Sequence, residues 1–232
     1  MHKFSLLPLT LLFVLATYFT STANTTPSEP KPETESFEVT LDSCYAQQYH
    51  DFQLTEKLCY DAFEKAMTGY LKINPDKEIL TIIDYSKASL EERLFVLDLK
   101  NNQLLFSSVV AHGQGSGDNY ATKFSNRPGS HQSSLGFFKT LGTYRGGNGY
   151  SLRLEGLEEE INDKALPRAI VMHGADYADP ERLKGAKRLG RSWGCPALPH
   201  KTNKEVIDTI KEGSVLFIYA EDSEYLEKSN YI

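Results

Sequence analysis

The hydrophobic residues are arranged differently in the N-terminal third of this chain and in the rest. Between Leu54 and Leu71 apolar side chains recur every three or four residues, which predicts an amphipathic helix. From Glu78 onward the apolar runs become short and polar turns separate them, a pattern typical of β-strands. We expect strands at residues 79–85, 93–98, 103–110, 135–138, 150–154, 168–172 and 214–219.

Turn signals between these runs add a hairpin, a long loop and a helix. Asn101 and Asn102 separate two strand runs and indicate a hairpin. Residues 118–134 are rich in Asn, Ser and Gly and predict a long loop, a kind of segment that is often functional. Thr202 and Glu205 form a capping-box pattern that predicts the start of a helix. Because strands outnumber helices, we expect a mainly β domain, a sandwich or open barrel, with a short N-terminal helical segment and one C-terminal helix.

The first residues have the pattern of a secretory signal peptide. Lys3 supplies a positive start, residues 4–18 are apolar, and Ala23 ends a group of small residues that suits cleavage. The apolar run is shorter than the roughly 20 residues that a membrane-spanning helix needs. We therefore expect an exported protein, periplasmic or in the cell envelope, without a stable membrane span after cleavage; a tether formed by an uncleaved leader stays open as an alternative.

Composition divides the chain into five parts. The segment after the leader is rich in Thr, Pro, Glu and Ser, which favours a flexible linker. The expected parts are a signal peptide at 1–23, a linker at 24–36, a helical segment at 37–75, a catalytic domain at 76–222 and a C-terminal tail at 223–232.

Charge and cysteine count restrict the possible functions. The chain has 232 residues and a net charge of -6, and it lacks the basic face that nucleic-acid binding requires. In an exported chain three cysteines suggest one free thiol. Cys44 and Cys59 could form a disulfide or remain two unlinked thiols, and Cys195 would then be the free one.

The chemistry of the chain concentrates around Cys195. The sequence from Ser192 through Trp193 and Gly194 to Cys195 and Pro196 indicates a turn and not a periodic core element. A buried structural thiol is the commonest alternative for a free cysteine. The turn favours a nucleophile instead, because glycine permits close approach and the N–H groups of Cys195 and Gly194 could stabilise an oxyanion.

His173 is the candidate base for this thiol. It ends an apolar run, and so it could either be a core histidine or open toward the thiol turn and accept its proton. His112 and His131 are the alternative bases. The basic residues before the turn could lower the pKa of the thiol or form a solvated face: Arg182, Lys184, Lys187, Arg188 and Arg191. No metal-binding motif is present in the sequence, and we expect neither a metal nor a cofactor.

Together these motifs resemble the murein L,D-transpeptidase catalytic domain. The resemblance spans about residues 79–219 and rests on His173–Gly174, on the Ser192-x-Gly194-Cys195 turn and on residues 133–138. It implies a β-rich fold, a nucleophile at Cys195 and a base at His173. The candidate substrate-binding residues are Gly174, Trp193, Arg191, Arg153, His112 and Ser134.

Two positions depart from the family pattern. Trp193 replaces the usual histidine in the thiol turn, and Ala197 replaces the usual arginine two residues after the cysteine. The role of that arginine is therefore unassigned, and Arg191 and Arg153 are the candidates to replace it.

The resemblance implies action on peptidoglycan stem peptides. Cys195 would form a thioester and pass the acyl group to an amine, giving a 3→3 crosslink, or to water, which would make the protein a hydrolase. A sortase would need an arginine downstream of the cysteine, and none follows Arg191. Papain-like peptidases carry the cysteine before the histidine. An inactive wall-binding module remains the alternative of another class, and the oligomeric state stays open.

Overall fold

The computed structural model describes the backbone of residues 34–232 and the side chains from residue 43 onward. The predicted signal peptide therefore lies outside the described residues, as does most of the predicted linker. The last three linker residues are already helical, because helix α1 (Thr34–Asp51) begins at Thr34. No helix within the described part is long and apolar enough to cross a membrane.

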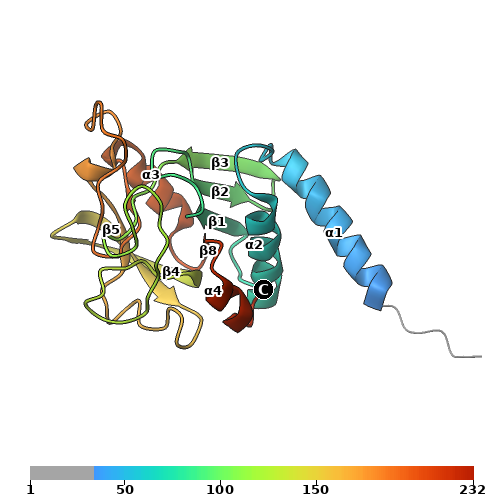
Figure 1. Ribbon diagram of the computed structural model, residues 1–232. Helices are drawn as coiled ribbons and strands as arrows, with labels where there is room; N and C mark the ends of the chain where they lie inside the picture. Colours follow the sequence, from blue (N-terminus) through green and yellow to red (C-terminus); the bar gives the residue numbers. More distant parts are fainter. Residues whose placement is uncertain (1–33) are drawn as a thin grey trace, which may run out of the picture.

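The described residues form one nearly closed sheet of eight strands (Figure 1). In spatial order the strands are β3 (Gln103–Ser108), β2 (Leu94–Asp98), β1 (Ile79–Asp84), β8 (Val215–Tyr219), β4 (Gly136–Gly146), β5 (Gly149–Gly156), β6 (Val171–Gly174) and β7 (Ala197–Leu198). This architecture confirms the predicted mainly β fold class.

Strand pairing connects the two ends of the domain. The predicted hairpin is present as the antiparallel pair β2–β3. The last strand, β8, inserts beside β1 in parallel and beside β4 in antiparallel orientation. At the far edge β6 pairs in parallel with β7, with His173 opposite Ala197. The sequence missed β7 because two residues are too few to show a period.

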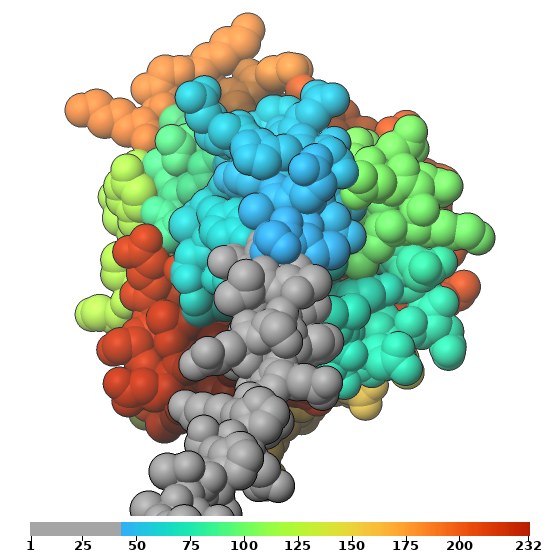
Figure 2. Space-filling model, turned by 90° about the vertical axis from the view of Figure 1, so that its right-hand side faces the viewer, coloured from blue at the N-terminus to red at the C-terminus, as the bar shows by residue number. Residues whose placement is uncertain are grey.

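Helices cover the sheet mainly near β1 and β8. Helix α2 (Tyr60–Ile73) packs on these strands, and α1 extends from the body beside it (Figure 1). Helix α3 (His200–Ile210) packs against β6, and the short helix α4 (Ser223–Lys228) follows β8. Figure 2 shows the side of the molecule that bears α1, with the C-terminal segment at its lower left.

Three helix predictions differ from the structure. Helix α2 begins at Tyr60, later than the predicted start at Leu54, because a turn precedes it. The prediction that a capping box at Thr202 starts a helix is wrong, because α3 begins two residues earlier, at His200. The Thr202 hydroxyl instead donates a 3.3 Å hydrogen bond to the Pro199 carbonyl. The predicted C-terminal tail contains a second C-terminal helix, α4, whose first turn is capped by Asp222.

The core is built on aromatic rings between α2 and the sheet. The Phe137 ring on β4 stacks on the Phe217 ring on β8, with 4.2 Å between centroids, and both side chains are buried. Helix α2 can approach these rings because Gly69 faces them. A Cβ atom at Gly69 would lie only 2.0 Å from the Phe137 ring.

We predict that Gly69→Ala destabilises the protein by about 1–3 kcal/mol, because the added methyl group overpacks the core. The same substitution at an exposed helix position would stabilise the helix by about 1 kcal/mol. Urea unfolding measures the difference. The matched control is Leu71→Ala on the same helix, where the side chain is exposed and we expect a change within about 0.5 kcal/mol. A Gly69→Ala variant as stable as the wild type would contradict this packing.

Candidate active site

The thiol of Cys195 lies against the start of β6. Its sulfur is 3.5 Å from the backbone nitrogen of Val171, which donates to it, and 3.7 Å from the Ala169 carbonyl, to which the S–H donates. The residue itself is half-buried. The backbone thus provides a donor for a thiolate and an acceptor for a thiol at the same sulfur atom.

The turn before Cys195 is closed by the Ser192 hydroxyl. This group donates to the Cys195 carbonyl at 2.6 Å and accepts from the Gly194 N–H at 3.1 Å. Gly194 has a φ of 123°, and a Cβ atom there would lie 2.8 Å from the Gln132 carbonyl. Because the turn uses the Gly194 N–H internally, the Cys195 N–H is the remaining candidate from the predicted oxyanion pair.

A neighbouring segment holds both sides of the thiol turn. The Ser192 N–H donates to the His112 carbonyl at 2.9 Å, and the Gln114 N–H donates to the Ser192 carbonyl at 2.8 Å. After the cysteine, Ala197 and Ala111 exchange backbone hydrogen bonds of 3.2 and 2.8 Å. These four hydrogen bonds hold the thiol turn against residues 111–114 on both sides of Cys195.

His173 lies on β6, the strand that begins at Val171, one of the two residues that contact the sulfur. It is paired with Ala197, and its N–H donates to the Pro196 carbonyl at 3.4 Å, so the register brings the thiol turn beside β6. Its Nδ1 is 3.0 Å from the Gly174 carbonyl. A carbonyl only accepts hydrogen bonds, and so Nδ1 carries the proton and Nε2 carries the lone pair that a base needs.

The Gly174 carbonyl therefore orients the candidate base. A side chain at this position would also collide with α3, because a Cβ atom would lie 2.6 Å from His200 Nδ1. Burial lowers the pKa of His173, and the hydrogen bond to Gly174 offsets part of that effect. The imidazole is thus neutral near pH 7 and able to accept a proton.

Burial also dominates the ionisation of Cys195. Desolvation raises the pKa of this thiol, while the Val171 N–H and the positive charge of Arg168 lower it. The predicted run of basic residues does not supply that charge. Arg191 donates to the Gly117 carbonyl at 2.7 Å, and Arg188 pairs with Asp118 at 2.6 Å. The sequence analysis missed Arg168 because it is a single basic residue at the start of the predicted strand 168–172; in the structure it lies in the turn before β6, which begins at Val171.

Several predicted substrate-binding residues have other surroundings. Arg153 lies over the Tyr144 ring at 4.3 Å on the exposed side of β5. Trp193 is exposed, with a relative accessibility of 72%, and its ring stacks on His131 with centroids 4.8 Å apart. Trp193 is therefore accessible to a ligand beside the thiol turn, whereas Arg153 contacts its own sheet.

Ser134 belongs to an internal hydrogen-bond network. Its hydroxyl accepts from Arg168 at 2.6 Å and donates to the Ser125 carbonyl at 2.9 Å. Ala197, which replaces the family arginine, is fully buried in a small cluster with Ala111, Ala175, Ala178 and Leu189. The side chains around Ala197 are therefore small and apolar, and this cluster offers no charged partner to an arginine.

His112 is buried and bonded to an arginine inside the protein. Its side chain is fully buried, and its Nδ1 accepts a 2.9 Å hydrogen bond from Arg93. Burial, with the added charge of Arg93, lowers the pKa of His112 to about 4. Arg93 also donates through two nitrogens to the Val110 carbonyl, and so the pair fixes the segment that holds the thiol turn.

The other cysteines are far from this chemistry. Cys44 and Cys59 are exposed free thiols, so the disulfide left open by the sequence is not formed in this structure. Among the described residues no cluster of three or more His, Cys, Asp or Glu side chains could hold a metal ion.

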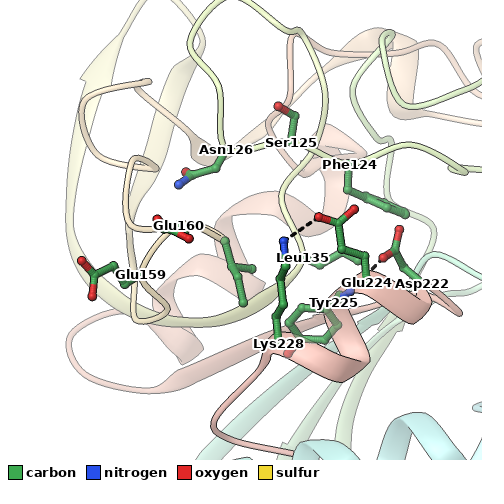
Figure 3. A pocket seen from close by; sticks show the side chains of 11 residues that line it. Phe124, Ser125, Asn126, Leu135, Glu159, Glu160, Asp222, Glu224, Tyr225 and Lys228 are labelled. Carbon is green, nitrogen blue, oxygen red and sulfur yellow. Dashed lines mark hydrogen bonds and ion pairs between the residues drawn. The ribbon is translucent and has the colours of Figure 1, made fainter.

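A cavity of about 380 Å³ lies between the 124–126 segment, the 159–161 turn and α4 (Figure 3). Figure 3 shows Lys228 paired with Glu224 at the edge of the cavity. Lys228 Nζ donates to Glu224 Oε1 at 2.6 Å. Cys195 is not among the lining residues, which are Phe124, Ser125, Asn126, Leu135, Glu159, Glu160, Ile161, Asp222, Glu224, Tyr225 and Lys228. The cavity shares Ser125 with the loop that Arg168 contacts.

One family model matches most of the chain. The sequence profile described as the L,D-transpeptidase catalytic domain matches residues 54–219. No curated protein matches the chain. Among solved structures, an L,D-transpeptidase from Mycobacterium smegmatis is 13% identical, with 62% of this chain and 59% of that chain covered and a TM-score of 0.39.

Two further solved structures are similar to the chain. L,D-transpeptidase 3 from Mycobacterium tuberculosis is 11% identical, with 63% of this chain and 62% of that chain covered and a TM-score of 0.39. The helical cell shape determining protein Pgp2 from Campylobacter jejuni is 12% identical, with 64% and 49% covered and a TM-score of 0.43. The chain thus spans about half to three fifths of the length of these structures.

We predict that His112 makes stability pH-dependent. Its pKa is lower in the folded state than in the unfolded state, so between about pH 6.5 and pH 4 the unfolded chain binds the proton more readily. The contribution of His112 should therefore fall as the pH falls, by at most about 1.4 kcal/mol per pH unit.

Urea unfolding of the wild type and of His112→Gln across this range measures that contribution. The variant keeps an acceptor for Arg93 and should have the shallower slope. His50→Gln on α1, where the histidine is exposed, is the control and should keep the wild-type slope. Equal slopes in wild type and His112→Gln would refute the assignment.

Proposed function

This chain belongs to the L,D-transpeptidase catalytic domain family, and we propose that it is an exported cysteine acyltransferase that acts on peptidoglycan stem peptides. The observation that carries the proposal is the hydrogen bond from His173 Nδ1 to the Gly174 carbonyl. It directs the lone pair to Nε2 on the strand beside the Cys195 turn. The expected leader at residues 1–23 supports export.

In the proposed first half-reaction, His173 Nε2 accepts the Cys195 proton as the sulfur attacks the carbonyl carbon of the third stem residue. The Cys195 N–H is suited to stabilise the oxyanion, and the Gly174 carbonyl keeps the imidazolium oriented. The imidazolium then protonates the departing amine of the terminal D-alanine. The C–N bond breaks and a thioester on Cys195 remains.

In the proposed second half-reaction, the amine of another stem peptide attacks the thioester. His173 accepts its proton, the C–S bond breaks, and the proton returns to the sulfur as the 3→3 crosslink is released. Water in place of the amine would give a carboxypeptidase with the same residues. The two activities differ in the exclusion of water and not in the catalytic groups.

A wall-binding module without activity is the competing function from another class. It would need neither an accessible thiol nor an oriented imidazole. The partial exposure of Cys195 and the fixed tautomer of His173 favour the enzyme.

We predict that Cys195→Ala abolishes covalent labelling by a carbapenem, because the sulfur that would form the adduct is gone. Intact-protein mass spectrometry measures the adduct, and thermal unfolding should change little. His173→Ala should slow labelling by at least about 100-fold, the usual contribution of a general base. His50→Gln is the control and should label at the wild-type rate. A wild-type protein that is folded and takes no label would favour the binding module.

We further predict that the mature protein converts purified tetrapeptide muropeptides, with loss of D-alanine. Mass spectrometry distinguishes a crosslinked dimer, the product of transfer to an amine, from a tripeptide, the product of transfer to water. Cys195→Ala is the matched control and should leave the muropeptides intact. Turnover by that variant would remove Cys195 from the mechanism.

A further inference from the structure

We propose that Arg168 is the positioning residue of this active site: it joins the 125–134 loop to the thiol turn and supplies the positive charge that faces the Cys195 sulfur. The catalytic part of this role rests on the proposed function. Arg168 would take over the role of the family arginine that Ala197 replaces.

The guanidinium group of Arg168 bridges four acceptors in one loop. Nη1 donates to the Ser125 carbonyl and to the Ser134 hydroxyl, both at 2.6 Å. Nη2 donates to the Gln132 carbonyl at 2.7 Å and to the Ser130 hydroxyl at 3.4 Å. The two ends of the loop also meet directly, because the Ser125 N–H donates to the Ser133 carbonyl at 3.0 Å and the Ser134 hydroxyl donates to the Ser125 carbonyl at 2.9 Å. Arg168 adds Ser130 and Gln132 to this junction, so one side chain bonds to the beginning, the middle and the end of the loop.

The bridged loop lies directly on the thiol turn. A Cβ atom at Gly194 would lie 2.8 Å from the Gln132 carbonyl and 3.5 Å from Arg168 Nη2. The Ser133 hydroxyl donates to the Gly194 carbonyl at 3.2 Å and accepts from the Gly113 N–H at 3.0 Å. A displacement of residues 132–133 would therefore move the residue next to Cys195.

Arg168 is also connected to the sulfur through the short segment that leads from it into β6. The next residue, Ala169, accepts from the Cys195 S–H, and Val171 donates to the same sulfur. Residues 168–171 thus make both the backbone contacts to the thiol and the side-chain bridge to the loop. We therefore expect a change in the Arg168 side chain to shift both the loop and the thiol contacts.

The charge of Arg168 acts on a thiol that has few other charged neighbours. Burial raises the pKa of Cys195, and Arg168 opposes this effect. Tyr85 and Tyr177 also interact with the thiol, but burial raises the pKa of each phenol to about 12, so both are neutral near pH 7. His173 lies beside the turn and is neutral as well.

The donor count favours positioning over direct binding of a substrate carboxylate. A guanidinium has four N–H donors on its two terminal nitrogens, and all four are engaged with the loop. Arg191 and Arg153, the replacements suggested by the sequence, are engaged at Gly117 and Tyr144.

The test measures the Cys195 thiol and the loop separately. Variants are made in a background with Cys44→Ser and Cys59→Ser, so that iodoacetamide modifies Cys195 alone. The pH dependence of alkylation gives the thiol pKa, and hydrogen exchange with mass spectrometry measures the amides of residues 125–134. Arg168→Gln removes the charge and the bridge, whereas Arg168→Lys keeps the charge and loses most of the bridge. Arg127→Gln is the matched control, because it removes an exposed arginine from the same loop.

We expect Arg168→Gln to raise the thiol pKa by about 1 unit or more, the effect of losing one nearby opposite charge. Hydrogen exchange of the amides of residues 125–134 should accelerate at least about tenfold, which corresponds to the loss of one or two hydrogen bonds. Arg168→Lys should keep the thiol pKa within a few tenths of the wild type and accelerate exchange, and Arg127→Gln should change neither quantity.

A wild-type thiol pKa in a folded Arg168→Gln variant would overturn the assignment of the charge. If that variant does not fold, Arg168→Lys decides: wild-type exchange rates in its loop would overturn the bridge. Neither measurement needs peptidoglycan or a carbapenem. A protein that fails the labelling test of the proposed function can therefore still support the role of Arg168.

Discussion

The pairing of Ala197 with two separate segments is the constraint on which the site depends. On one side this residue exchanges backbone hydrogen bonds with Ala111, and on the other it lies opposite His173. Both contacts require backbones to approach closely, and the small buried cluster around Ala197 permits this. An arginine here would place an unpaired charge among apolar groups, at a cost of several kcal/mol. The positive charge of the site therefore has to come from another part of the chain.

Burial keeps the two proposed reacting groups uncharged before substrate binds. It raises the pKa of Cys195 and lowers that of His173, so the neutral thiol and neutral imidazole are the favoured pair near pH 7. A stable ion pair is not required, because a base with a fixed tautomer can accept the proton during attack. The Gly174 carbonyl and the Val171 N–H then stabilise the charges that develop on each partner.

Two buried or half-buried arginines organise the loops around this pair, and both bond mainly to neutral acceptors. Arg93 fixes the segment between β3 and His112, and Arg168 bridges the 125–134 loop. Planar guanidinium groups suit this task because they direct several donors at once. The thiol turn lies between the two segments, so it is held from both sides without a disulfide or a metal ion among the described residues.

The sequence by itself determined the mainly β class, the β2–β3 hairpin and the candidate pair Cys195 and His173. These follow from local information: short apolar runs, an Asn-Asn turn and residues adjacent in a motif. Tertiary structure alone decided the burial of His112, the pairing of β7, and the choice of Arg168 over Arg191 as the cation at the sulfur. Each of these depends on contacts between segments that are 19 or more residues apart, and the pairing of β7 also depends on strand register. Periodicity and composition report on neighbours along the chain, and they contain no record of which distant segment will supply a charge.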